Sequence, residues 1–101
     1  MRVVLCNAPS DHAERIARAL VEAKLAACVN VVPAVVSVYR WKGTIERQEE
    51  STLMIKTADD RVAALMDEIR KQHPYEVPEI VALEATDVNP AYARWVDQET
   101  R

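Results

Sequence analysis

The amino-acid sequence predicts an α+β fold with the element order β-α-β-β-α-β and a short helix at the end of the chain. Three observations support this prediction. Two segments repeat apolar residues at the 3.6-residue spacing of a helix that buries one face. β-rich runs lie before, between and after these segments, and the single Gly, Gly43, divides the longest run into two strands. Split β-α-β folds have this order, with two helices on one face of a four-stranded sheet, so we expect a ferredoxin-like sandwich.

The first strand and the first helix follow from local patterns. Val3–Ala8 is a short β-rich run. Asp11 and Glu14 then have the three-residue spacing of a capping box, so we expect the helix to begin there and to run to about Leu25. Its buried face carries Ala13, Ile16, Ala17, Leu20 and Val21.

A long hairpin is predicted from Cys28–Trp41 and Thr44–Thr57. Gly43 lies where the chain must reverse, and Gly adopts a positive φ without strain. Lys-Gly is a weaker turn signal than Asn-Gly, so a bulged loop is an equal alternative to a tight turn. Pro33 cannot donate to a strand ladder, which indicates a bulge or an edge position.

Thr57 and Asp60 together look like the start of a second helix, which is expected to end at about His73 because Pro74 follows. Its buried stripe is Val62, Leu65, Met66 and Ile69. Residues 73–79 are predicted to form a stiff, extended linking segment, and Ile80–Ala85 the last strand.

Asn89 and Pro90 predict the N-cap and first position of a short terminal helix. The apolar face of this helix carries Tyr92, Trp95 and Val96.

The length and composition of the chain exclude several classes of function. We expect one domain over residues 1–101. The net charge is −3, from scattered charges without a basic stripe, so nucleic acid is not an expected partner. Apolar stretches fall far short of the ~20 residues that span a bilayer, and the start does not resemble a signal peptide. Two cysteines without a C-x-x-C motif suit a reducing compartment, so we expect the cytoplasm.

The long hairpin predicts self-association. At about 3.3 Å per residue, Val29–Trp41 reaches roughly 43 Å, about twice what two such helices cover. Past Pro33 both faces of this strand carry apolar side chains. We therefore expect sheet-to-sheet packing between copies of the chain. The alternative is that Tyr39 and Trp41 fold over their own core.

Ferredoxin-like topology brings Cys6, His12 and His73 to one end of the sheet and leaves Cys28 at the other. A Cys6–Cys28 disulfide is therefore excluded. A Cys thiolate with a His imidazole suits copper or zinc, with a third ligand from water, His12 or a neighbouring chain. The structural alternative is a buried apolar Cys and a His that caps helix carbonyls.

Enzymatic interpretations are weaker. Cys6 and His73 lack an evident orienting residue and an oxyanion loop. No Gly-rich loop is present to hold phosphates. The hairpin carboxylates of Glu46, Glu49 and Glu50 are interpreted as a solvated face. We expect a binding protein and not an enzyme.

Four blocks of sequence together resemble the CutA family of divalent-cation tolerance proteins. They are LVEAKLAACVNVVP at 20–33, SVYRWKGTIE at 37–46, LMIKT at 53–57 and HPYEVPEI at 73–80. The resemblance covers nearly the whole chain. It implies a PII-like homotrimer packed through the long hairpin strands, and a link to copper and other divalent cations.

The resemblance also implies site residues. Copper ligands attributed to the family correspond to Cys6 and His73, but the first His of a His-His pair is replaced by Gln72. Amides bind soft metals poorly, so we expect weak copper binding. PII-type trimers bind small effectors in clefts between subunits, and the residues expected to line such clefts are Trp41, Lys56, Tyr75 and Glu79.

Overall fold

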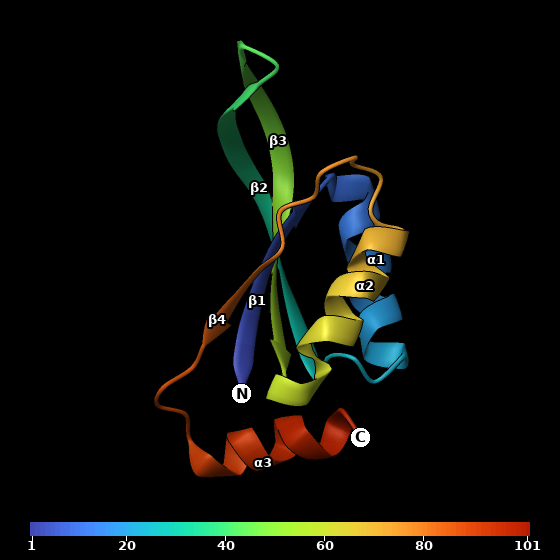
Figure 1. Cartoon of the computed structure of the whole chain (residues 1–101), viewed down its shortest axis with the longest axis vertical. Coiled ribbons are helices and arrows are strands. Elements are labelled where there is room, and N and C mark those ends of the chain that lie inside the picture. Colours follow the sequence, from blue (N-terminus) through green and yellow to red (C-terminus); the bar gives the residue numbers. More distant parts are fainter.

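The computed structural model describes residues 1–101. Its elements are β1 (Arg2–Ala8), α1 (Ser10–Glu22), β2 (Cys28–Trp41), β3 (Thr44–Thr57), a 3-10 turn (Asp59–Arg61), α2 (Val62–Gln72), β4 (Val81–Glu84) and α3 (Pro90–Glu99). The sheet order is β2-β3-β1-β4, and every neighbouring pair is antiparallel. Figure 1 shows α1 and α2 on one face, α3 beneath the sheet, and the β2-β3 hairpin projecting beyond the helices. The predicted ferredoxin-like fold is confirmed. No helix has both the length and the apolar content needed to cross a membrane.

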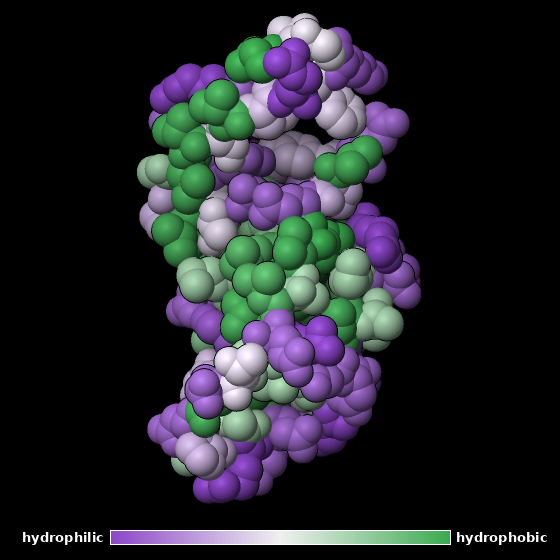
Figure 2. All heavy atoms as spheres, turned by 60° about the vertical axis from the view of Figure 1, so that its left-hand side comes forward, coloured by the Kyte–Doolittle hydropathy of each residue, from purple (hydrophilic) through white to green (hydrophobic).

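The sheet face opposite the helices is apolar and uncovered. Val4 and Ile55 point toward the helices, so their neighbours in the alternating pattern point away. Leu5 lies opposite Met54 on β3 and Val81 on β4, and these residues therefore form part of the uncovered face. Figure 2 shows apolar surface gathered over the middle of this side and along the projecting hairpin. Large exposed apolar residues of this face are Val32, Met54, Val81 and Leu83.

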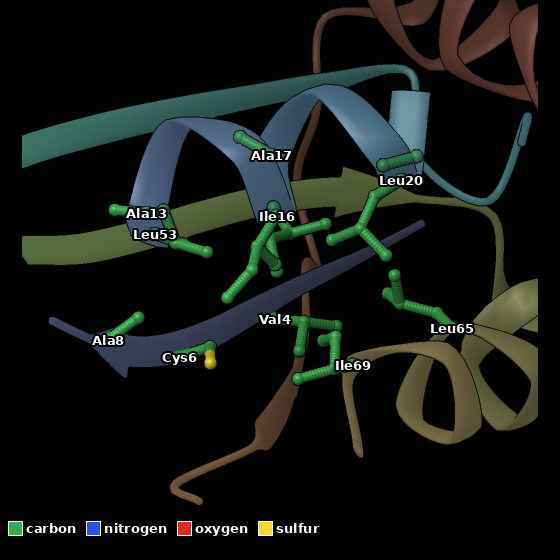
Figure 3. Close-up of a cluster of buried hydrophobic side chains, with 12 residues drawn as sticks. Val4, Cys6, Ala8, Ala13, Ile16, Ala17, Leu20, Leu53, Leu65 and Ile69 are labelled. Carbon is green, nitrogen blue, oxygen red and sulfur yellow. The ribbon is translucent and has the colours of Figure 1, made fainter. Parts of the chain in front are cut away.

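The core lies between the sheet and the two helices. In Figure 3, Ile16 and Leu20 of α1 point toward β1, and Leu65 and Ile69 of α2 pack in from the side. The 3.6-residue period therefore identified most of the buried face of both helices. Val21, predicted to be buried, is 41% exposed instead, because it lies about 100° around α1 from Leu20, at the edge of the buried stripe. The cluster comprises Val4, Cys6, Ala8, Ala13, Ile16, Ala17, Leu20, Ala26, Leu53, Ile55, Leu65 and Ile69.

The two ends of α1 differ from the prediction. No capping box forms, because Pro9 takes the N-cap position and offers no side-chain hydrogen bond. The helix also ends before Leu25. Lys24 adopts φ 58°, and its N–H donates to the carbonyl of Val21 at 3.0 Å, while the N–H of Leu25 donates to Leu20 at 3.0 Å. This is a Schellman motif with Lys in the left-handed position.

The hairpin turn is tight. Trp41 pairs with Thr44, and the two residues between them have φ 49° (Lys42) and 82° (Gly43). Two positive φ values define a type I′ turn, so the bulged loop is wrong. A bulge does lie between Val32 and Val35, where Pro33 interrupts the ladder of an edge strand, as predicted.

The start of the second helix also differs. Thr57 ends β3, and its buried hydroxyl donates to the carbonyl of Leu25 at 2.7 Å. A 3-10 turn at Asp59–Arg61 leads into α2 instead. β4 is shorter than predicted and pairs with β1 only up to Leu5. The predicted N-cap of α3 is confirmed, because the Asn89 side chain accepts the N–H of Ala91 at 3.2 Å.

Candidate functional site

Cys6 and His73 meet where β1 ends, as the topology predicted. The imidazole Nε2 of His73 lies 2.7 Å from the carbonyl oxygen of Asn7, and the thiol of Cys6 lies 3.7 Å from the same oxygen. His12 lies in the first turn of α1, where its Nδ1 is 3.0 Å from an Asp11 carboxylate oxygen. It has no hydrogen bond to the other two residues. The structure therefore brings Cys6 and His73 together and leaves His12 paired with its neighbour.

The thiol of Cys6 is in its neutral form at physiological pH. Its side chain is completely buried and points into the core beside Val4 (Figure 3). Burial, followed by the charges of Glu79 and Glu50, raises the pKa of this thiol from 9.0 to about 12. Because the thiolate is the form that binds metals and attacks electrophiles, Cys6 is a poor ligand and nucleophile in this state.

Both ring nitrogens of His73 are engaged. Nε2 faces the Asn7 carbonyl, which only accepts hydrogen bonds, and Nδ1 lies 3.1 Å from the N–H of Tyr75, which only donates. These partners require a neutral imidazole with its proton on Nε2. Neither nitrogen has a lone pair free for a metal ion.

Gln72 has a structural role at the end of α2. Its side-chain carbonyl accepts from the Arg15 guanidinium at 2.8 Å, and its amide nitrogen donates to Glu68 at 2.9 Å. Arg15 also donates to the backbone carbonyl of Gln72 at 3.2 Å, which satisfies a carbonyl at the helix end. Gln72 thereby links α1 to α2.

The pair does not fit a preformed metal site. No group of three or more His, Cys, Asp or Glu side chains is arranged to hold an ion. The thiol is protonated, and the imidazole has no free nitrogen. Cys6 and His73 therefore remain copper ligands by prediction only. The burial of Cys6 favours the structural alternative for the thiol, whereas the His73 side chain bonds a carbonyl of β1 and not a helix carbonyl as that alternative proposed.

A polar pair beside this site escaped the sequence analysis. The phenol of Tyr75 donates to the Glu50 carboxylate at 2.7 Å, and only 5% of Glu50 is exposed. The interpretation of Glu50 as part of a solvated face is therefore wrong. Burial and the nearby carboxylate raise the pKa of Tyr75, because both disfavour the phenolate. Glu46, Glu49 and Glu50 lie on the same strand, and nothing in the sequence distinguished the buried Glu50 from the two exposed residues.

One chain does not bring the four predicted cleft residues together. Trp41 lies at the hairpin tip, with the Lys42 ammonium 5.7 Å from its ring centroid. Lys56 lies toward the opposite end of the sheet, beside the start of β2, where its ammonium donates to the Asn30 side chain. Tyr75 and Glu79 belong to the segment between α2 and β4. A shared cleft would need more than one copy of the chain.

Both cysteines are free. Cys6 pairs across β1 and β3 with Leu53, whereas Cys28 pairs with Lys56 on the other side of β3. The intervening strand excludes the disulfide for the reason that the sequence suggested.

Replacing Tyr75 by Phe is expected to lower the free energy of unfolding by about 1–3 kcal/mol, because it leaves a buried carboxylate without its donor. Urea denaturation measures the loss. Tyr39→Phe is the matched control, since Tyr39 is 39% exposed and donates to Gln48 at 2.8 Å near the surface. Equal losses in the two variants would show that the Tyr75–Glu50 hydrogen bond stabilises the fold no more than an exposed hydrogen bond does.

Comparisons with known proteins agree on a family. The family described as "CutA1 divalent ion tolerance protein" matches residues 2–99. The CutA homolog of Xenopus laevis is 52% identical over 89 residues, which are 87% of this chain and 59% of that protein. A solved structure of the divalent cation tolerance protein of Thermus thermophilus has a TM-score of 0.96 and 44% identity, with full coverage of both chains. The PII-like protein CutA of Nostoc sp. PCC 7120 has a TM-score of 0.96 and 42% identity, covering 100% of this chain and 98% of that one.

The chain spans about half to three-fifths of the length of its vertebrate relatives, namely 59% of the frog protein and 50% of the mouse protein. It spans 96% of the Thermus thermophilus protein, to which it is 44% identical over 99 residues. These relatives are described as divalent-cation tolerance proteins. With residues 2–99 matched and the fold shared throughout, the chain belongs to the CutA1 divalent ion tolerance protein family.

Proposed function

We propose that this chain is the subunit of a cytoplasmic homotrimer that contributes to tolerance of divalent cations and binds copper weakly. The observation that carries the proposal is the family match over residues 2–99. We expect residues 1–101 to fold as one domain in each subunit.

The uncovered sheet face supports the assembly. Val81 and Leu83 of β4 are 45% and 47% exposed in one chain, and Val38 and Ile45 of the hairpin are 68% and 58% exposed. A soluble subunit rarely leaves such a surface in water. A closed ring of three copies buries the three faces against one another and shelters the edge strands β2 and β4.

The contacts of Cys6 and His73 support the expectation that any copper binding by this pair is weak. An ion that used both residues would displace the thiol proton and break a hydrogen bond of His73. Both costs reduce the net affinity, so we expect copper to bind weakly.

Titration of the wild-type protein with copper(II) chloride, followed by calorimetry, tests the cation part of the proposal. Weak, saturable binding is expected in the wild type. It should be lost in Cys6→Ala and His73→Gln and kept in His12→Gln, which removes a partly exposed histidine outside the site. Unchanged binding in the first two variants would exclude Cys6 and His73 as ligands, and absent binding in the wild type would remove copper from the proposal.

A second candidate is a PII-like sensor or adaptor that binds a small metabolite between subunits, and the likeness to the PII-like protein of Nostoc favours it. The proposed cleft residues are Trp41, Lys56, Tyr75 and Glu79. Thermal-shift screening against nucleotides and organic anions tests this function. A stabilising ligand whose effect disappears in Lys56→Ala supports a sensor, and the absence of any shift contradicts it.

A further inference from the structure

Residues 73–80 link α2 to β4 and are fastened at both ends. His73 closes α2 through its own N–H, which donates to the Ile69 carbonyl at 2.8 Å. At the other end, Ile80 packs against the core cluster. Between these points the segment has no strand partner, because β4 begins only at Val81. Side chains must therefore hold it in place.

The same segment lies beside Cys6. The thiol and the His73 imidazole approach the same carbonyl oxygen, that of Asn7. β4 does not cover this part of β1, because its pairing stops at Leu5 opposite Val81. Cys6 is nevertheless completely buried. The segment thus helps to cover the end of β1 where regular strand pairing is missing.

His73 holds the segment in place through two hydrogen bonds, one that its ring donates and one that its ring accepts. Its Nε2–H donates to Asn7 at 2.7 Å, and its Nδ1 accepts from Tyr75 at 3.1 Å. The first contact joins the segment to β1, and the second fixes the turn that follows Pro74. The rings of His73 and Tyr75 also pack with centroids 4.6 Å apart. Tyr75 in turn donates to Glu50 of β3.

We propose that residues 73–80 form a gate over Cys6 and that the neutral Nε2–H tautomer of His73 holds this gate closed. Any reagent, oxidant or soft metal ion then reaches the thiol only in the fraction of molecules in which the segment has opened. The gate is a property of the metal-free protein and goes beyond the proposed function. The outcome of its test is therefore independent of whether the protein binds copper.

The experiment uses the full chain in a Cys28→Ser background, with EDTA present, so that Cys6 is the only thiol. Nitrogen-15 NMR of the two histidines reports the tautomer of His73, and His12→Gln assigns the signals. Iodoacetamide labelling at pH 8 then measures the opening of the gate. Hydrogen exchange of α1 amides in the same samples measures opening of the core.

We expect His73 to show one protonated and one unprotonated nitrogen, with the proton on Nε2. His73→Ala should accelerate labelling of Cys6 about tenfold, since it removes two hydrogen bonds, while exchange in α1 stays unchanged. His73→Gln should recover at least half of the lost protection, because its amide offers a donor and an acceptor. His12→Gln should label at the parental rate.

Four results would overturn the gate. They are a proton on Nδ1 of His73, an unchanged labelling rate in His73→Ala, a rate in His73→Gln equal to that in His73→Ala, and a gain in labelling matched by an equal gain in α1 exchange. If His73→Ala fails to fold, a proton on Nδ1 of His73, or a labelling rate in His73→Gln about tenfold or more above the parental rate, would still overturn the gate.

Discussion

Replacing Leu83 by Lys is expected to convert the assembled protein into single chains. Leu83 lies opposite Val3 on the sheet face that points away from the helices, and it is 47% exposed in one subunit. In a closed ring, three copies of this side chain would be buried at once. Each Lys would bring an unpaired ammonium into an apolar contact, at a cost of several kcal/mol per copy. Sedimentation velocity should find one species with the 11.4 kDa mass of one chain.

Val21→Lys is the matched control for this change. Val21 is 41% exposed near the C-terminal end of α1, on the helical side of the molecule, so the same substitution there should leave the assembly intact. A Leu83→Lys protein that sediments like the wild type would show that the uncovered sheet face is not the contact between subunits.

Replacing Leu20 by Ala is expected to cost about 2–5 kcal/mol per chain in the free energy of unfolding. Leu20 is completely buried between α1, α2 and the sheet, and the tight packing around it leaves a cavity when its side chain is shortened. Its backbone carbonyl also accepts the N–H of Leu25 at the end of α1, so the local collapse that would fill the cavity is restricted. Urea denaturation at fixed protein concentration measures the loss.

The adjacent residue provides the comparison for the core prediction. Val21→Ala removes apolar atoms from the same turn of α1, but at a half-exposed position, and should change the free energy of unfolding by less than about 0.5 kcal/mol. Similar losses at the two positions would show that the buried stripe of α1 is not where the helix gains its stability.

Much of the fold followed from the sequence because its signals are periodic and local. Apolar spacing in α1 and α2, the single Gly of the hairpin and the Asn89 cap each depend on a few neighbouring residues. The errors arose where distant residues decide. Thr57 resembles a helix cap, but its hydroxyl donates to Leu25, which is 32 residues away in sequence. The end of α1 was placed too late, because nothing local marks Lys24 as a residue with positive φ.

The site was predictable only in part. Topology brought Cys6 and His73 to the same end of the sheet, and the structure agrees. The tautomer of His73 depends on a carbonyl of β1, 66 residues away, and the burial of Glu50 depends on Tyr75, 25 residues away. Contacts between residues so far apart in the sequence follow no fixed spacing, so the sequence pattern does not predict them. Cys and His are common metal ligands, so the sequence suggested a ligand pair. The hydrogen bonds instead engage both nitrogens of the His73 ring and leave none free for a metal ion.

The mass of the wild-type protein in solution tests whether copies of the chain assemble. We infer that one helical layer leaves a sheet face and a long hairpin which only other copies of the chain cover. Sedimentation equilibrium at about 1 µM should give three times the 11.4 kDa mass of one chain, as expected for a tight assembly with an extensive apolar contact. A stable, folded monomer at that concentration would contradict the claim, and with it the trimer and any cleft between its subunits.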